Sequence, residues 1–148
     1  MAGGRAGLWL TGWRRDGRAG DGGDTVIGAL LVGVFGVAGA LVRFAVDSWF
    51  AHRTQRRHWP WATLLVNVTG CLIIGLSIGI TGRLGMAPEW QTAVATGLAG
   101  GLTTFSSWTT ATVRLLSEAR FGAAALNVGV NLAAGFAAAA LGMALAAA

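Results

Sequence analysis

The sequence predicts an all-α membrane protein with four transmembrane helices, the third of which is broken in the middle of the membrane. Hydrophobic residues make up 54% and charged residues 11% of the 148 residues, and the mean hydropathy is +0.61. Soluble domains carry about twice that share of charge. The apolar residues gather in long stretches, each near or above the roughly 20 residues that a spanning helix needs. The stretches run from about Thr25 to Phe50, Ala62 to Thr81, Trp90 to Leu116 and Phe121 to Ala148.

Residues 1–24 differ from the rest of the chain in being rich in Gly and Arg. They contain no apolar run long enough for the core of a signal peptide. We expect a disordered tail at 1–24 and a single four-helix transmembrane domain at 25–148. The net charge of +5 comes from eleven arginines without a lysine, and they stand mainly in the tail and the loops, as in segments that flank membrane lipid. Nucleic-acid binding is therefore not expected.

The first apolar stretch has one face of small residues, Gly36, Gly39 and Ala40, which ends at Arg43. Small residues at helical spacing let a second helix approach closely. Asp47 follows Arg43 by four residues, so the two side chains can meet on that face. Two roles for Arg43 stay open: a local ion pair that orients the helix end, and a role near the entrance of an ion.

The second stretch contains an amide, Asn67, within an otherwise apolar helix. A polar side chain in the hydrocarbon zone raises the free energy unless it is hydrogen-bonded. Asn67 therefore bonds a neighbouring helix or faces a wet path. Cys71, Gly75 and Gly79 follow at intervals of four and predict a packing seam on the same helix.

The third stretch holds the segment that organises the chain, Gly100-Gly101-Leu102-Thr103-Thr104. Paired glycines and β-branched threonines are poor helix formers, so we expect the helix to open here and leave carbonyls without partners. Irregular backbone at membrane depth survives only where protein buries it, or where it lines a wet path or binds an ion. The alternative is an unbroken helix whose glycines serve close packing.

The fourth stretch carries Asn127, Asn131 and Gly135, which lie four apart and form one polar-to-small stripe. Amide N–H groups donate hydrogen bonds without carrying charge. Such donors suit a path in which a small anion must be drawn in and then released.

These motifs, in this order, resemble the CrcB or Fluc family of fluoride channels over about residues 28–145. The resemblance implies a homodimer whose subunits insert in opposite orientations, with two pores that export fluoride passively. It also implies a structural sodium ion, which is not transported and is held by the backbone carbonyls of Gly100 and Thr103. The motifs are Gly36 to Phe44, Trp61 to Gly70, Gly100 to Trp108, and Asn127 with Asn131.

The resemblance also assigns the pore residues. Asn67 matches the pore asparagine and Phe105 the first of two pore phenylalanines, while Trp108 stands where the second is usual. Asn127 and Asn131 stand where the family often has tyrosine and serine. Fluoride gives up water only to dense hydrogen-bond donors, and the edges of aromatic rings are positive. The expected donors are Asn67, Thr104, Ser106, Asn127 and Asn131.

Three other function classes compete with a channel. A proton-coupled four-helix drug exporter is the alternative, but it needs a carboxylate inside the membrane, and Asp47 and Glu118 lie toward the ends of the stretches. A membrane assembly factor without transport would also be compatible with the glycine seams. An enzyme is not expected, because the sequence offers no nucleophile with a base and no cluster of His, Cys and carboxylates. We expect the bacterial plasma membrane as the location.

Overall fold

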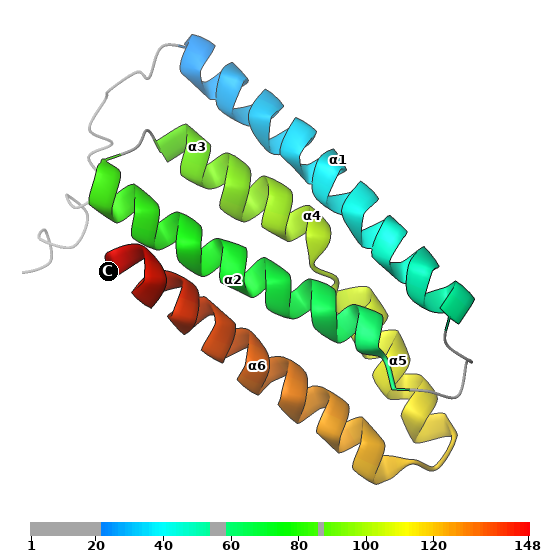
Figure 1. The fold of residues 1–148 in the computed structure, drawn as a ribbon. Helices are drawn as coiled ribbons and strands as arrows, with labels where there is room; N and C mark the ends of the chain where they lie inside the picture. The colour runs from blue at the N-terminus through cyan, green and yellow to red at the C-terminus, as the bar shows by residue number, and fades with distance from the viewer. Residues whose placement is uncertain (1–21, 54–58, 86–87) are drawn as a thin grey trace, which may run out of the picture.

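The computed structural model describes residues 22–53, 59–85 and 88–148, and every element within these ranges is a helix (Figure 1). Three of the helices are long and apolar enough to cross a membrane: α1 (Gly22–Arg53), α2 (Trp61–Leu84) and α6 (Phe121–Ala147). Their apolar windows have mean hydropathies of 2.4, 2.1 and 1.8. These helices match three of the predicted spans. Helix α1 begins at Gly22, so the last three residues of the predicted tail are helical, and the rest of that tail lies outside the described residues.

The predicted third span is divided into short pieces. It comprises α3 (Pro88–Thr92), the π-helical segment η1 (Ala93–Ala99), α4 (Gly100–Leu102) and α5 (Phe105–Ser117). Between α4 and α5 the backbone is extended, with ψ of 157° at Thr103 and φ of −147° at Thr104. The expected break is therefore present (Figure 1).

The break lies at the threonine end of the predicted segment, Gly100 to Thr104, and not at its glycines. Gly100 and Gly101 are helical, and the chain opens only at Thr103 and Thr104. A Cβ atom on Gly101 would collide with the backbone of Gly36 in α1, so this glycine serves close packing. The two threonines make the break because their branched side chains favour extended backbone. The hydroxyl of Thr104 then starts α5 by accepting a hydrogen bond from the Ser107 N–H at 3.2 Å.

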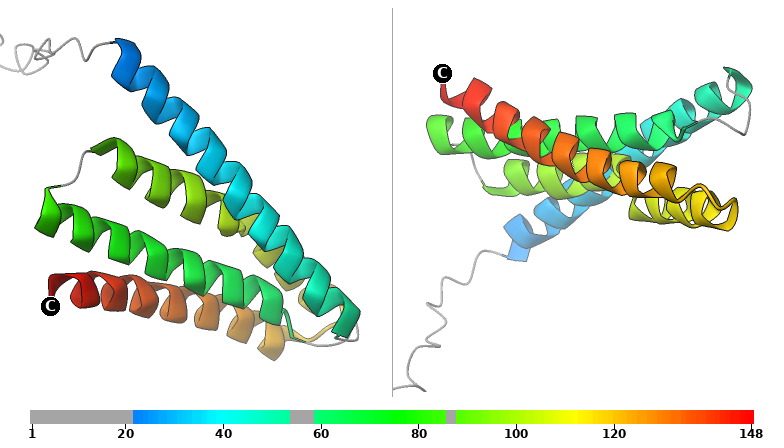
Figure 2. Two further views of the ribbon diagram at one scale, coloured as in Figure 1. Left: turned by 45° about the horizontal axis from the view of Figure 1, so that its top comes forward. Right: turned by 90° about the horizontal axis from the view of Figure 1, so that it is seen from below.

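Glycines also set how the helices approach one another. On α1, Gly39 is buried and lies against the backbone of Leu98 and Leu102. Between α2 and α6, Gly75 lies against the backbone of Ala139, and Gly142 against that of Leu72. Helices α2 and α6 run side by side in all three views, while α1 crosses the others at an angle (Figure 2). This arrangement brings the middle of α2, the middle of α6 and the start of α5 together at the break.

Candidate functional site

The candidate site is a cluster of uncharged polar side chains at the helix break. Asn67 comes from α2, Asn127 and Asn131 come from α6, and Thr104 is the cap of α5. Their exposed fractions are 0% for Asn127, 7% for Asn131 and 5% for Thr104. Burial of this kind is favourable only if the polar atoms are hydrogen-bonded.

Asn67 is held by the backbone of the break. Its Oδ1 accepts a hydrogen bond from the Thr104 N–H at 2.9 Å, and its Nδ2 donates to the Thr104 carbonyl at 3.4 Å. A backbone N–H can only donate and a carbonyl can only accept, so these two bonds fix which way the amide faces. The same Nδ2 donates to Oδ1 of Asn131 at 3.3 Å. The two bonds that Asn67 donates are therefore longer than the one that it accepts.

The amides of α6 continue this chain of hydrogen bonds. Nδ2 of Asn131 donates to the carbonyl of Asn127 at 3.0 Å and to its Oδ1 at 3.1 Å. Nδ2 of Asn127 donates to Oγ1 of Thr112 at 2.9 Å, and that hydroxyl donates to the Trp108 carbonyl at 2.9 Å. The side-chain donors of Asn67, Asn131, Asn127 and Thr112 thus form a chain that runs in one direction, from Asn67 to the Trp108 carbonyl.

Two aromatic rings stand beside the amides. Phe105 and Trp108 lie edge to face, with ring centroids 5.4 Å apart and planes at 69°. The indole Nε1 of Trp108 donates to the Asn127 carbonyl at 3.3 Å, whereas the Phe105 ring is 72% exposed. The rings and amides share a cavity of about 260 Å³, which is lined by Asn67, Cys71, Thr103, Thr104, Phe105, Trp108, Asn131 and Leu132.

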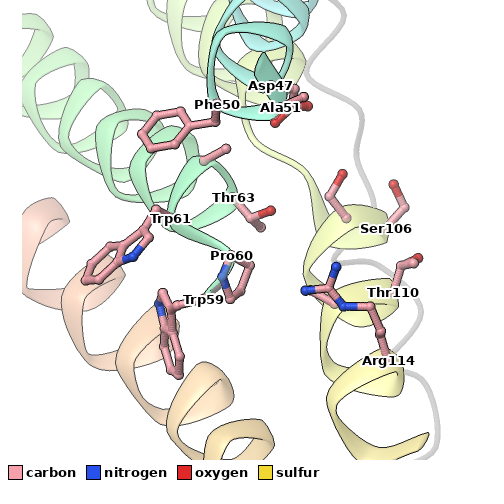
Figure 3. A pocket seen from close by; sticks show the side chains of 13 residues that line it. Asp47, Phe50, Ala51, Trp59, Pro60, Trp61, Thr63, Ser106, Thr110 and Arg114 are labelled. Atoms are coloured by element: carbon pink, nitrogen blue, oxygen red, sulfur yellow. The ribbon is translucent and has the colours of Figure 1, made fainter. Parts of the chain in front are cut away.

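A second, larger cavity lies toward the end of the bundle where α2 and α6 begin. It has a volume of about 580 Å³, and the start of α2 faces the polar side of α5 across it (Figure 3). Thr63 projects from α2, while Ser106, Thr110 and Arg114 project from α5. The hydroxyl of Ser106 is also 3.2 Å from that of Thr104. Hydroxyl groups thus lead from this cavity to the helix break.

Arg43 reaches the break from α1. Its Nη1 donates to the carbonyl of Thr103 at 3.4 Å. The ion pairs found within the described ranges join Arg114 and Arg120 to Glu118, and do not include Arg43 with Asp47. Of the two roles left open for Arg43, the local ion pair is thus not observed. The geometric reason is that the Thr103 carbonyl, freed from the helix, offers the guanidinium a closer acceptor.

Two carbonyls at the break lack their usual helical partners. The Thr104 N–H would bond the Gly100 carbonyl in an unbroken helix, but it donates to Asn67 instead. The Ser107 N–H donates to the Thr104 hydroxyl and not to the Thr103 carbonyl. The Gly100 carbonyl accepts a 3.4 Å bond from the Thr103 hydroxyl. The Thr103 carbonyl accepts from Arg43, and oxygen atoms of this kind are also the ligands that hard cations prefer.

The structure brings most of the predicted site residues together. Asn67, Thr104, Asn127, Asn131, Phe105 and Trp108 form one cluster, and Ser106 borders the adjoining cavity. Two participants were not singled out for the site: Thr112, which accepts from Asn127, and Cys71, which lines the smaller cavity. Their spacing in the sequence could have indicated both residues. Cys71 follows Asn67 by one helical turn, and Thr112 follows Trp108 by one helical turn, so each lies on the same helix face as a predicted site residue.

Comparison with known proteins identifies the family. The family model for the CrcB-like protein, Camphor Resistance (CrcB), matches residues 30–143. A protein of Renibacterium salmoninarum named fluoride-specific ion channel FluC is 48% identical over 123 residues, which cover 80% of this chain and 98% of that protein. Proteins of Thermobifida fusca and Symbiobacterium thermophilum, each named fluoride-specific ion channel FluC 1, are also similar to this chain. They are 43% and 38% identical, and the matches cover 78% of this chain and 92% and 94% of the relatives. The chain is thus a multi-pass integral membrane protein that belongs to the CrcB family.

Proposed function

We propose that this protein is a fluoride-selective channel that exports fluoride passively across the bacterial plasma membrane. The observation that carries the proposal is the uncharged amide cluster at the helix break, formed by the half-buried Asn67 and the buried Asn127 and Asn131. A fixed positive charge beside the amides would hold an anion, whereas amide N–H groups draw it in and still release it. Arg114 lines only the wider cavity from which the proposed path starts. The names of the relatives point to the same ion.

The proposed path starts in the larger cavity and passes the hydroxyls of Ser106 and Thr104 to reach Asn67. There the anion must compete for N–H groups that already have acceptors. Asn67 donates at 3.3 and 3.4 Å, near the limit for a hydrogen bond, so these N–H groups exchange partners at low cost. A desolvated anion is a stronger acceptor than a carbonyl oxygen, because charge-assisted bonds are roughly twice as strong.

The aromatic pair supplies a second kind of contact in this proposal. The edges of Phe105 and Trp108 carry the positive part of the ring quadrupole, so they attract an anion weakly and without directional trapping. The two rings lie edge to face with their centroids 5.4 Å apart, so one ring edge faces away from the neighbouring ring and is free to contact an anion.

A passive channel fits the sequence better than the proton-coupled exporter. Exchange of a proton for a substrate needs a carboxylate in the membrane-spanning path. In the part of the chain that the structure describes, Glu89 stands at the start of α3 and Glu118 follows the end of α5. Asp47 lies in the last two turns of α1 and lines the wide cavity at the start of the path, but not the smaller cavity at the amides. The polar groups of the amide cluster are instead uncharged.

We further propose that the channel is an antiparallel homodimer with four spanning helices in each subunit. Phe105 is 72% exposed beside the buried amides, and a Cβ on Gly100 would meet nothing within 4 Å in the single chain. A second copy seated on this face would cover the ring and complete the pore. The α1 face also exposes Val34, Val37 and Leu41 at 66%, 62% and 63%, in position to pack against that copy or lipid.

The dimer would also complete the sodium site. Two carbonyls, those of Gly100 and Thr103, come from each subunit, so two copies supply four oxygen ligands at a two-fold axis. The ion would hold the two breaks together without being transported. Arg43 donates to the Thr103 carbonyl, so the guanidinium lies at the edge of this site and limits the space for a further cation.

The experiment that tests the function is an electrical one. Planar bilayers that contain the purified protein should carry a fluoride current whose reversal potential follows the fluoride gradient and ignores an imposed pH gradient. A reversal potential that follows the pH gradient would instead favour the proton-coupled exporter.

A further inference from the structure

We propose that Thr112 is a positioning residue for conduction, acting through Asn127 to set the direction in which the amides of the site present their N–H groups. The inference rests on the proposed function, because it takes the amide cluster as the anion path. Thr112 lies on α5, outside the two cavities. Its role follows from hydrogen-bond direction.

Thr112 acts on Asn127 as an acceptor only. A hydroxyl has one proton, and that of Thr112 is directed to the carbonyl of Trp108 at 2.9 Å. The oxygen can then only accept from Asn127, which it does at 2.9 Å. Asn127 must therefore turn its Nδ2 toward Thr112 and its Oδ1 toward Asn131. The indole of Trp108 bonds the carbonyl of Asn127 at 3.3 Å and so holds the same residue by its backbone.

The direction set at Asn127 passes along the amides. With Oδ1 of Asn127 facing it, Asn131 donates through Nδ2 at 3.1 Å and turns its own Oδ1 toward Asn67. Asn67 then donates to that oxygen at 3.3 Å. Reversing one amide would bring two N–H groups or two oxygens face to face. The backbone of Thr104 fixes one end of this chain, and the carbonyl of Trp108, through Thr112, fixes the other.

Water cannot replace the Thr112 hydroxyl in the structure as it stands, because Asn127 is 0% exposed. Without that hydroxyl the Nδ2 of Asn127 has lost its acceptor, and a buried donor without a partner is unfavourable. The amide then gains by turning away, and Asn131 loses the Oδ1 acceptor of Asn127 and keeps only the backbone carbonyl of that residue. In that state two N–H groups meet between Asn127 and Asn131, the fixed donor–acceptor order along the amides is lost, and the N–H groups are no longer held ready for the anion, so conduction falls.

The test compares fluoride efflux from liposomes for variants that separate the hydroxyl from side-chain volume. Thr112→Val and Thr112→Ala remove the hydroxyl and leave different volumes, whereas Thr112→Ser keeps it. Thr109→Val is the matched control, because the Thr109 hydroxyl donates only to carbonyls of its own helix, those of Phe105 and Ser106 at 3.0 Å. Size-exclusion profiles and thermal unfolding in detergent are recorded for each variant.

We expect Thr112→Val and Thr112→Ala to conduct fluoride roughly tenfold or more slowly than the wild type, because the buried donor of Asn127 is left unpaired. Thr112→Ser and Thr109→Val should conduct like the wild type. Wild-type flux in Thr112→Val or Thr112→Ala, or failure of Thr112→Ser to conduct, would overturn the inference alone. Variants without the hydroxyl that no longer fold would make Thr112 a stability residue and overturn it too. A wild-type protein that does not conduct would overturn the proposed function itself.

Discussion

The backbone N–H of Thr104 donates a 2.9 Å hydrogen bond to the side-chain oxygen of Asn67. This bond joins the helix break to the amide of α2, because the N–H that would continue the helix is the one that orients the amide. Neither feature is stable alone in hydrocarbon: the break leaves a donor unpaired, and the amide needs a partner. Each satisfies the other, and the bond places a fixed polar group in the middle of an apolar bundle.

Cys71 offers a direct test of whether the smaller cavity is the anion path. It lines that cavity with Asn67, and it is the one cysteine of the chain, so modification has a single target. A methanethiosulfonate reagent transfers its thioalkyl group to the thiol as a disulfide and releases methanesulfinate, and a bulky, uncharged group attached in this way would fill much of the cavity. Fluoride efflux from liposomes should then fall strongly after treatment. Cys71→Ala should conduct and be insensitive to the reagent, and full flux in the modified wild type would place the path elsewhere.

The sodium proposal predicts that channel activity depends on the cation present. The proposed ligands, the carbonyls of Gly100 and Thr103, are backbone atoms, so the cation must be varied in place of a side chain. Fluoride efflux should decline when sodium is exchanged for N-methylglucamine on both sides of the membrane, and it should return when sodium is restored. Protein-free liposomes control for leaks. Flux that is unchanged after prolonged sodium removal would exclude a structural sodium ion.

The arginines predict that single chains insert in both orientations. If four helices span the membrane, each face carries five of the flanking arginines, which leaves no positive-inside bias. One face has Arg5, Arg14, Arg15, Arg18 and Arg83, and the other has Arg53, Arg56, Arg57, Arg114 and Arg120. Reporters fused to the C-terminus, one active in the cytoplasm and one in the periplasm, should both give signal. Activity of only one reporter would contradict this, and adding arginines to one face should shift the ratio.

Much of the fold could be predicted because hydrophobic length and helix-breaking residues are local properties. The three continuous helices and the broken segment follow from apolar runs and from Thr103 and Thr104. The prediction that the glycine pair opens the helix was wrong, because helix propensity describes an isolated helix. Gly101 is helical where it packs against Gly36 of another helix. Contacts between residues that are far apart in the sequence cannot be predicted from the local sequence.

The composition of the site was more predictable than its hydrogen bonds. Asn67, Asn127 and Asn131 stood out as amides in apolar helices, and the structure brings them together. For Asn67 the sequence left open a bond to a neighbouring helix or a wet path, and the bond to a neighbouring helix is present. The stripe of Asn127 and Asn131 suggested a path for an anion, whereas in the structure these amides donate to one another and to Thr112. The partner of Arg43 was likewise unforeseen, because the Thr103 carbonyl becomes available only once the helix opens. Donor and acceptor pairing depends on how helices approach, which spacing alone does not give.

Asn67 should be the polar side chain on which conduction depends most, because it alone contacts the break, Asn131 and the cavity. Replacing it with Asp keeps the acceptor for the Thr104 N–H but removes both donated bonds and sets a negative charge in the path of an anion. At an effective dielectric constant of about 20 that repulsion is on the order of 4 kcal/mol at a separation of about 4 Å. Asn67→Ser keeps a small uncharged donor and is the matched control for loss of size.

The measurement that tests the account most directly is fluoride efflux from liposomes for the wild type, Asn67→Asp and Asn67→Ser, with chloride efflux as the control. We predict rapid fluoride efflux and little chloride efflux for the wild type, near-complete loss of fluoride flux in Asn67→Asp, and a smaller loss in Asn67→Ser. Equal fluoride flux in the wild type and Asn67→Asp would remove Asn67 from the pore. Wild-type flux no faster than that of protein-free liposomes would contradict the channel assignment.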